Sequence, residues 1–298
     1  MRGSELLERC KPIIGVVHLP PLPGSPGYGR RPYPLPYGPK YTFNDIIEYA
    51  IEEAKKYESA GFDGVIIENY GDKPYSITPP PESVAAISII AREVAKNISI
   101  ALGISLLRNA PHLALAAAHM SGASIIRANS LCEVRVSPEG IMMPAARDLA
   151  EKAAYLGLYD SLIKGDIIVI ADVDVKHSAP LGSWDPIAVV EECQDRAGIP
   201  VRAIAVTGPR TGVQPSQEYL DNISSSARRL GISVFVGSGV TSEIIPQLWR
   251  SADGFIVGTA AKLGGKTENV VSLERAKRIA QMVERYRKVW PCAQFRGE

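Results

Sequence analysis

Eight short apolar segments alternate with stretches of helical periodicity along almost the whole chain, and this alternation constrains the fold more than any other feature. The apolar segments have the length of buried strands, and the stretches between them repeat apolar residues every three or four positions. Strands that alternate with helices form a parallel sheet. About eight such units without a break in composition favour a closed (β/α)8 TIM barrel over a doubly wound sheet. The predicted strands are Ile13–His18, Gly64–Asn69, Ile98–Ile104, Ser124–Asn129, Ile167–Val173, Arg202–Thr207, Ser233–Ser238 and Gly254–Thr259.

The helical stretches have recognisable starts and stops. In Asn44–Ala60 the apolar residues share one face, Asn44 is the expected N-cap, and Gly61 is the expected stop. The α/β pattern runs without interruption, so we expect one domain over residues 1–298 with a barrel core at about residues 11–288. The other predicted helices are Pro80–Ala95, Pro111–Met120, Pro144–Leu156, Pro186–Ala197, Ser216–Leu230, Ser242–Trp249 and Val271–Trp290.

The composition is that of an ordinary soluble globular protein, with 46% hydrophobic residues, 22% charged residues and a net charge of +1. A charge this close to zero, without basic clusters, gives no general attraction to nucleic acid. No apolar run reaches the length of a membrane span, and the N-terminus lacks the apolar region of a signal peptide, so we expect a cytoplasmic protein. The four cysteines lie far apart with no CxxC pair, which predicts reduced thiols and no zinc site.

Three long loops follow predicted strands and should rise from the rim where TIM barrels place their chemistry. The first loop, Leu19–Lys40, is rich in Pro, Gly and Tyr, and loops of this length are usually functional or disordered. We expect it either to cover the site as a lid, with Arg30 and Arg31 as anion contacts, or to dock a partner as a polyproline II segment. The other loops are Tyr70–Pro81 and Ser130–Met143, in which Val134–Ile141 fits a small hairpin.

The last two predicted strands both end in glycine followed by small hydroxyl residues. The first of these endings carries Gly237, Ser238 and Gly239, and the second carries Gly258 and Thr259. Consecutive endings of this kind hold phosphate in many TIM barrels, because backbone N–H groups without a neighbouring Cβ can approach the anion. The sequence therefore predicts a phosphate site, although the glycines could also serve only to make tight turns.

Polar residues gather at the ends of the other strands. If the strand Ile167–Val173 persists, alternation places Asp172, Asp174 and Lys176 on the face that points into the barrel mouth, and Arg127 and Asn129 share a face of their own strand. A polar ring above an apolar interior follows from this pattern. The strand ends that complete the ring are His18, Glu68 and Thr207.

A ring of this kind can carry out proton transfer. Asp172 or Glu68 would be the base and Lys176 would stabilise the resulting enolate, with Asn129 and Thr207 orienting the substrate. A Schiff base on Lys176 is disfavoured, because neighbouring carboxylates oppose the lowered pKa that it requires. The alternative is a purely structural ion network that joins Arg127 and Lys176 to the carboxylates.

Other residues of the rim also allow two interpretations. His18 acts in catalysis or is simply hydrogen-bonded. Arg108 binds a substrate anion or pairs with Glu68 or Asp72. No metal is assigned, because none of the spacings among the candidate ligands is diagnostic; these candidates are Glu68, Asp172, Asp174 and His177.

These residues resemble the BtpA family from about Lys11 to Tyr286. The resemblance implies a phosphate-binding TIM barrel. The family takes its name from members needed for photosystem I biogenesis, and related SgcQ-like members accompany sugar-uptake genes. Ser105, Ala110 and the segment Ser137–Gly140 depart from the family pattern, which weakens a metal site on that rim. The matching motifs are His18–Gly24, Glu68-Asn69 with Gly71–Pro74, Leu107–Asn109, Ala171–His177, Thr207-Gly208 with Thr211-Gly212, Gly237–Gly239 and Gly258-Thr259.

The residues and the family resemblance together indicate two alternative functions. The first is an enzyme, a lyase or isomerase that abstracts a proton from a small phosphorylated sugar or nucleotide-like substrate. The second is a non-catalytic assembly factor of the photosystem I type that binds partners through the proline-rich rim loop. The phosphate grip could also hold flavin mononucleotide, but no cofactor is assigned. The tail Trp290–Phe295 could dock on a second subunit of a homo-oligomer or back on the barrel.

Overall fold

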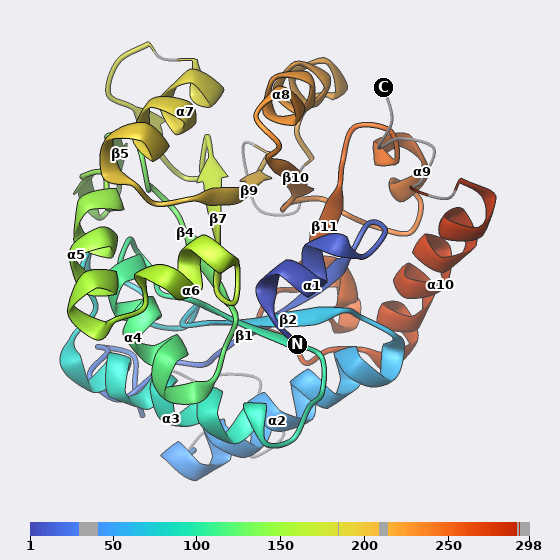
Figure 1. The fold of residues 1–298 in the computed structure, drawn as a ribbon. Coiled ribbons are helices and arrows are strands. Elements are labelled where there is room, and N and C mark those ends of the chain that lie inside the picture. Colours follow the sequence, from blue (N-terminus) through green and yellow to red (C-terminus); the bar gives the residue numbers. More distant parts are fainter. Residues whose placement is uncertain (30–40, 184, 209–213, 291, 293–298) are drawn as a thin grey trace.

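The eight predicted strands close into one parallel barrel, as expected. The computed structural model describes residues 1–29, 41–183, 185–208, 214–290 and 292. Around the ring the strands follow the order β1-β11-β10-β9-β7-β4-β3-β2, with the helices outside (Figure 1). The strands are β1 (Ile13–His18), β2 (Gly64–Glu68), β3 (Ala101–Ser105), β4 (Ile125–Ala128), β7 (Ile168–Val173), β9 (Val201–Val206), β10 (Ser233–Val236) and β11 (Gly254–Val257).

The helices fall close to the predicted ranges, with corrections at their ends. The N-cap of α2 is Thr42 and not Asn44: its hydroxyl accepts from Asp45 N, and Asp45 Oδ2 accepts from Thr42 N at 2.6 Å. The stretch expected to be a helix over Ser242–Trp249 contains only the short α9. The helices are α2 (Phe43–Ala60), α3 (Pro81–Ala95), α4 (Pro111–Ser121), α5 (Ala146–Leu156), α6 (Tyr159–Lys164), α7 (Pro186–Ala197), α8 (Gln217–Arg229), α9 (Ile245–Leu248) and α10 (Leu273–Val289), with 3₁₀ turns η1 (Thr259–Ala261) and η2 (Leu263–Gly265).

A short N-terminal helix, α1 (Gly3–Glu8), closes the end of the barrel at which the strands begin. Its Leu6 is fully buried in the apolar cluster that fills the barrel interior. Two backbone bonds hold it there, from Gly3 N to Asp166 O (3.1 Å) and from Ser4 N to Gly165 O (2.8 Å). The sequence did not reveal this helix, because six residues are too few to show a helical period. The interior cluster is Leu6, Ile14, Val16, Ile66, Ala101, Ile125, Ile168, Ile170, Ala203, Ala205, Phe235 and Ile256.

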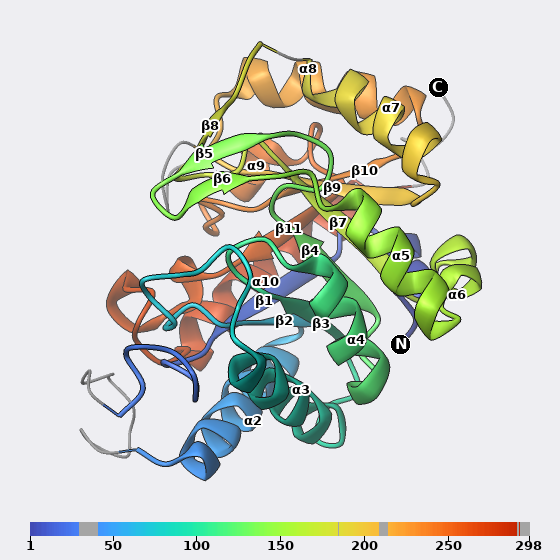
Figure 2. The same ribbon diagram turned by 90° about the vertical axis from the view of Figure 1, so that its left-hand side faces the viewer.

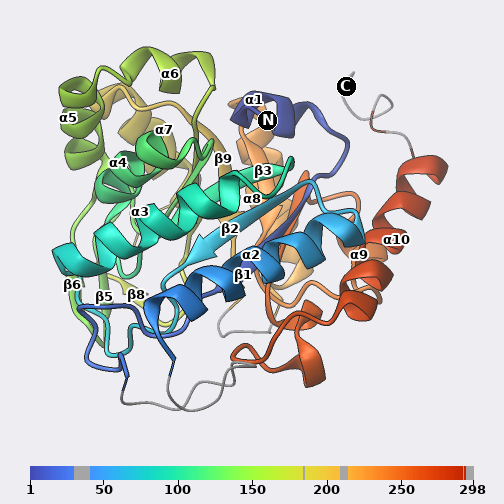
Figure 3. The ribbon, with the colours of Figure 1, turned by 90° about the horizontal axis from the view of Figure 1, so that it is seen from below.

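A small antiparallel sheet stands on the opposite end of the barrel from α1, as Figures 2 and 3 show. It consists of β5 (Arg135–Ser137), β6 (Gly140–Met142) and β8 (Ala179–Pro180), in the order β6-β5-β8. The first two strands form a hairpin at the place where the sequence predicted one, with Val136 opposite Ile141. The added strand β8 comes from the loop after β7, so this sheet joins two loops of the barrel mouth.

The described half of the proline-rich loop packs against the rim instead of covering the mouth. Leu22 is fully buried, and its backbone N donates to Asp72 Oδ1 (2.7 Å). Tyr41 Oη donates to Pro21 O (3.3 Å) on the far side of the loop. None of residues 19–29 lines the cavity described below. The predicted anion contacts Arg30 and Arg31 lie outside the described residues, as do Thr211, Gly212 and most of the tail after Trp290.

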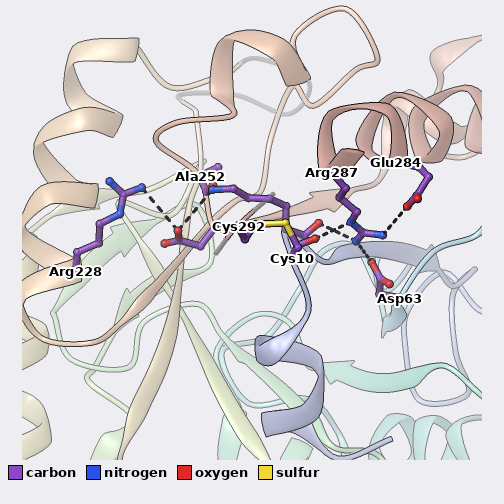
Figure 4. The surroundings of a disulfide bond; sticks show 9 residues. Cys10, Asp63, Arg228, Ala252, Glu284, Arg287 and Cys292 are labelled. Carbon is purple, nitrogen blue, oxygen red and sulfur yellow. Dashed lines mark hydrogen bonds and ion pairs between the residues drawn. A yellow bond between two sulfur atoms is a disulfide. The ribbon is translucent and has the colours of Figure 1, made fainter. Parts of the chain in front are cut away.

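The expectation of reduced thiols is wrong for this structure, in which the cysteines form two disulfides. Cys10 pairs with Cys292 and Cys132 pairs with Cys193. For Cys10 and Cys292, separation in the sequence was misleading because barrel closure brings the two ends of the chain together. Figure 4 shows how Arg287 holds them: it donates to Cys10 O (2.6 Å) and pairs with Asp63 (2.7 Å). Within the described part of the chain, no helix has the length and apolar character needed to cross a membrane.

Candidate active site at the barrel mouth

A cavity of about 700 Å³ opens at the carboxyl-terminal ends of the barrel strands. This is the end where TIM barrels place their active sites, and the volume suits a small metabolite. Most of the predicted site residues line it, whereas Asp172, Asp174 and Thr207 do not. The predicted residues in its wall are His18, Glu68, Arg108, Asn129, Lys176, Gly237, Ser238, Gly239, Gly258 and Thr259.

Strand register builds one side of the cavity floor. His18 lies opposite Glu68, Glu68 opposite Ser105, and Ser105 opposite Arg127 on successive strands. Ser105 Oγ donates to Glu68 Oε2 (3.2 Å), while His18 Nε2 and Arg127 Nη1 each lie 3.9 Å from a Glu68 oxygen. Both distances are too long for a hydrogen bond; the contact with Arg127 is a long ion pair. The Glu68 carboxylate is therefore held in place but remains open to the cavity.

The Asp172 carboxylate does not line the cavity and is bound by two residues that do. It accepts from Arg127 Nε (2.8 Å), from Arg127 Nη2 (3.1 Å) and from Asn129 Nδ2 (2.7 Å). A two-point contact of this kind fixes the plane of the guanidinium. The geometry thus makes Asp172 a residue that aims Arg127 and Asn129 at the cavity.

Lys176 reaches the cavity by a different route from the one that strand alternation suggested. The strand β7 ends at Val173, and Asp174 adopts a left-handed backbone with φ of 50°. The Asp174 carboxylate consequently turns outward to Arg135 (3.0 Å) and Tyr219, so its expected place in the barrel mouth is wrong. Thr207 Oγ1 accepts from Lys176 N (3.2 Å) and donates to Asp174 O (3.3 Å), which holds this turn beneath the cavity wall.

Burial and the surrounding cations shift the acid–base properties of the floor. Burial, together with Lys262, Lys176, Arg127 and Lys73, holds the pKa of His18 well below its ordinary value, so its imidazole is neutral. Burial and Arg127 lower the pKa of Lys176, although Glu68 and Asp172 oppose this shift. Burial disfavours the charged form of Arg127, but Asp172 and Glu68 outweigh it and raise its pKa. The floor thus offers a fixed cation, a more easily deprotonated amine and a neutral imidazole.

The two glycine-bearing turns face the same cavity, as the sequence predicted for a shared anion site. Gly239 has φ of 69°, which side chains other than glycine rarely adopt. A Cβ on Gly258 would lie 2.9 Å from His18 Cε1, so glycine is required for this turn to approach the floor. Ser238 is buried, and its hydroxyl has no hydrogen-bond partner among the described residues. An unpaired buried hydroxyl in a cavity wall is suited to meet a ligand.

Several residues of the cavity wall are not marked by any of the sequence patterns above. Arg275, in the first turn of α10, lines the cavity and donates from Nε to Ala260 O (2.8 Å). Thr267 shares a hydrogen bond with Thr259 between their hydroxyl oxygens (2.8 Å). Glu139 enters from the hairpin, and Lys73 lies above the Tyr70 ring. A strand-end signal marks none of these residues, because they lie in loops and on a helix.

The described side chains do not form a metal-binding cluster: no three His, Cys, Asp or Glu residues in this part of the chain lie together. Cations dominate the cavity wall instead, and the acidic side chains there are Glu68 and Glu139. The cationic residues of the wall are Lys73, Arg108, Arg127, Lys176 and Arg275.

The chain is similar to known proteins in sequence and to solved structures in fold. A protein of Pyrococcus horikoshii is 42% identical over 93% of this chain and 98% of its own. The photosystem I biogenesis protein BtpA of Synechocystis is 33% identical over 90% of this chain and 86% of its own. Among solved structures, 3-keto-L-gulonate-6-phosphate decarboxylase from Vibrio cholerae covers 95% of this chain and 100% of its own, with a TM-score of 0.52 and 14% identity. At that identity the likeness shows the fold alone.

The family assignment rests on nearly the whole chain. The model of the BtpA family matches residues 9–285, which include the barrel strands, both glycine-bearing turns and the polar floor. The resemblance drawn from the sequence motifs is therefore confirmed, and the chain belongs to the BtpA family.

Proposed function

We propose that this protein is an enzyme that binds a small phosphorylated metabolite and abstracts a proton from it, as a lyase or isomerase does. The observation that carries the proposal is the shared cavity, in which the turns after β10 and β11 meet the floor formed by Glu68, Arg127 and Lys176. One end of this cavity suits an anion, and the other end suits proton transfer.

The phosphate would bind between the two glycine-bearing turns. Gly237, Gly239 and Gly258 present backbone without side chains, and Arg275 adds a positive charge. Ser238 presents a hydroxyl with no hydrogen-bond partner among the described residues. Backbone N–H groups and an arginine are common phosphate ligands. The decarboxylase from Vibrio cholerae has the same fold, and its name places a phosphate on its substrate, which supports this assignment by analogy.

Glu68 is the stronger candidate for the base. It lines the cavity, and its carboxylate has no close cationic partner among the described residues, whereas both oxygens of Asp172 are engaged. Glu68 would take the proton from a carbon next to a carbonyl, and the electron pair of that C–H bond would pass to the carbonyl oxygen as an enolate. Lys176 and Arg127 would stabilise the oxygen that gains charge.

His18 and Asp172 would act by positioning. The neutral imidazole of His18 lies beside Glu68 and beneath the Gly258 turn, where it can hydrogen-bond to the substrate. Asp172 would fix the orientation of Arg127 and Asn129. Thr207 would support the turn that carries Lys176. We expect the reaction to take place in the cytoplasm.

The phosphate site is tested with Ser238→Ala. The lost hydroxyl has no hydrogen-bond partner among the residues that the structure describes, so stability should not change. Affinity for phosphate should fall by about tenfold, because a hydrogen bond to a charged group is lost. The matched control is Ser124→Ala, just before β4 at the other end of the barrel. It removes another buried hydroxyl for which the described chain offers no hydrogen-bond partner. Thermal shift and calorimetric titration with inorganic phosphate give the affinities. Equal affinity in both variants would contradict the site.

A second candidate is an assembly factor that binds protein partners, and the name of the Synechocystis relative favours it. In that case the Glu68→Gln and Lys176→Ala variants should fully complement cells that lack the protein and return them to the normal phenotype. Loss of complementation by both variants, with normal protein levels, would favour the enzyme.

A further inference from the structure

The cavity wall opposite the phosphate turns contains a specific pair of polar atoms. In the closed ring β3 lies four strands from β10, which places the two strands on opposite sides of the barrel. Arg108 follows β3 and lines the cavity, while Gly237–Gly239 follow β10 and line it from the other side. A ligand whose phosphate binds at the glycines and which extends across the mouth would therefore reach Arg108.

Arg108 has a donor that the fold does not use. Its side chain is 6% exposed, and Nη2 donates to Lys176 O (2.8 Å). Its Nε is buried and has no hydrogen-bond partner among the described residues. The nearby acceptor, Glu139 Oε2, is also buried and unpartnered, and it lies 3.6 Å from this Nε. The two atoms lie within ion-pair distance, but 3.6 Å is too long for a hydrogen bond. Neither the donor nor the acceptor therefore has a hydrogen-bond partner in the described part of the chain.

Glu139 is held firmly in this position. It lies in the turn between β5 and β6, and the base of that hairpin is fixed by Arg135, which is 2% exposed. Arg135 donates to Glu133 (2.8 Å), Asp174 (3.0 Å) and Ser178 (2.7 Å). The β8 strand pairs with β5 and adds further support. The position of Glu139 beside Arg108 is thus part of the fold.

The chemistry of this pair selects its ligand. A hydroxyl can accept from Arg108 Nε and donate to Glu139 Oε2 at the same time. A carboxylate or a second phosphate would satisfy the arginine but would meet the charge of Glu139, which is unfavourable for like charges. We propose that the substrate is a sugar phosphate, and that a hydroxyl far from its phosphate binds between Arg108 and Glu139; this inference rests on the phosphate site of the proposed function. Arg108 and Glu139 would then determine specificity, because together they select a ligand that carries a hydroxyl at this position.

The test compares sugar phosphates with alkyl phosphates of the same carbon number. Pentose 5-phosphates, hexose 6-phosphates, pentyl phosphate and hexyl phosphate are each titrated into the protein in a calorimeter, and their affinities are compared. Inorganic phosphate probes the phosphate end of the cavity alone. We expect at least one sugar phosphate to bind about tenfold or more tightly than its alkyl counterpart, because hydrogen bonds to two charged groups are gained.

In Glu139→Gln the ratio of the affinity for the sugar phosphate to that for the alkyl phosphate should fall by about tenfold. The affinity for inorganic phosphate should stay within twofold of the original value. Arg108→Lys, which keeps the charge but loses Nε, should act in the same direction. Glu191→Gln on the exposed face of α7 removes the same charge elsewhere and should change neither affinity. Equal binding of every sugar phosphate and its alkyl counterpart would overturn this inference alone, and so would an advantage that persists in Glu139→Gln. Failure of inorganic phosphate and of all phosphate esters to bind would overturn the proposed function and this inference together.

Discussion

Glu53 and Lys262 form an ion pair in which both side chains are buried, although 209 residues separate them in the sequence. Lys262 Nζ lies 3.0 Å from Glu53 Oε2, and the same oxygen accepts from Val271 N (2.7 Å). Glu53 of α2 thus holds both ends of the segment 262–271, which a bridge between Lys262 and Val271 closes. This segment carries Gly265 and Thr267 into the cavity wall.

Removing one partner of this pair should be costly. Lys262→Met leaves the Glu53 carboxylate buried with less compensation, and the free energy of unfolding should fall by about 3–5 kcal/mol. Urea denaturation measures this change. Arg147→Met, which breaks the exposed pair between Arg147 and Glu151, is the control and should change stability very little. Similar losses for both variants would show that the burial of Glu53 and Lys262 has been misjudged.

Glu68→Gln should abolish proton transfer while leaving substrate binding intact. If a bound sugar phosphate loses a carbon-bound proton to Glu68, solvent deuterium will enter that position, and NMR can follow the exchange. We expect the variant to slow exchange by about 10²–10⁴-fold, which is the usual contribution of a general base. Exchange at the original rate would exclude Glu68 as the base.

Asp172→Asn should act mainly on the fold. It removes the carboxylate that neutralises the buried guanidinium of Arg127, whose other carboxylate neighbour, Glu68, lies 3.9 Å away. We expect a loss of about 3 kcal/mol or more in denaturation experiments. Deuterium exchange in the folded fraction should fall less than in Glu68→Gln. The opposite order of the two variants would identify Asp172 as the base instead.

The lowered pKa of His18 predicts a pH dependence of stability. Burial and the neighbouring cations keep His18 neutral in the folded protein below its ordinary pKa of 6.5, whereas the unfolded chain binds a proton there. Because the unfolded state binds more protons, the stability contribution of His18 falls as the pH drops below about 6.5.

His18→Gln should therefore show a flatter loss of stability than the original protein between pH 6.5 and 5. The pKa values of His112 and His177 are lowered as well, but both residues remain in the variant, so the difference between the two curves isolates His18. Parallel curves would contradict a neutral buried imidazole.

The disulfides can be tested by thiol titration. Protein denatured without a reductant should show no reactive thiols, and protein denatured with a reductant should show four. Reduction should lower the stability of the fold by roughly 2–5 kcal/mol per bridge, because each cross-link restricts the unfolded chain. Four reactive thiols before reduction would restore the original expectation of free cysteines.

The sequence predicted the barrel well because buried parallel strands leave a strong local signal. All eight strands lie within three residues of their expected starts, and both glycine-bearing turns and Glu68 reach the cavity as expected. Each of these features depends only on neighbours in the sequence. Alternation along a strand then decides which side chains point into the barrel.

Predictions that needed geometry beyond the strand end were less successful. Asp174 points outward because β7 ends at Val173, the residue before it, and the backbone of Asp174 itself is left-handed. Cys10 and Cys292 pair because the ring closes, which their spacing does not reveal. Thr267 reaches the cavity through the loop that Glu53 holds, and Arg275 reaches it from the first turn of α10. No local sequence pattern marks either contact.

A crystal structure of the full chain with a bound hexose 6-phosphate tests the central claim most directly. We predict that the phosphorus atom lies between the Gly237–Gly239 turn and Gly258, with the sugar extending over Glu68 towards Arg108. A phosphate bound elsewhere on the molecule, or a sugar that points away from Glu68, would contradict the account.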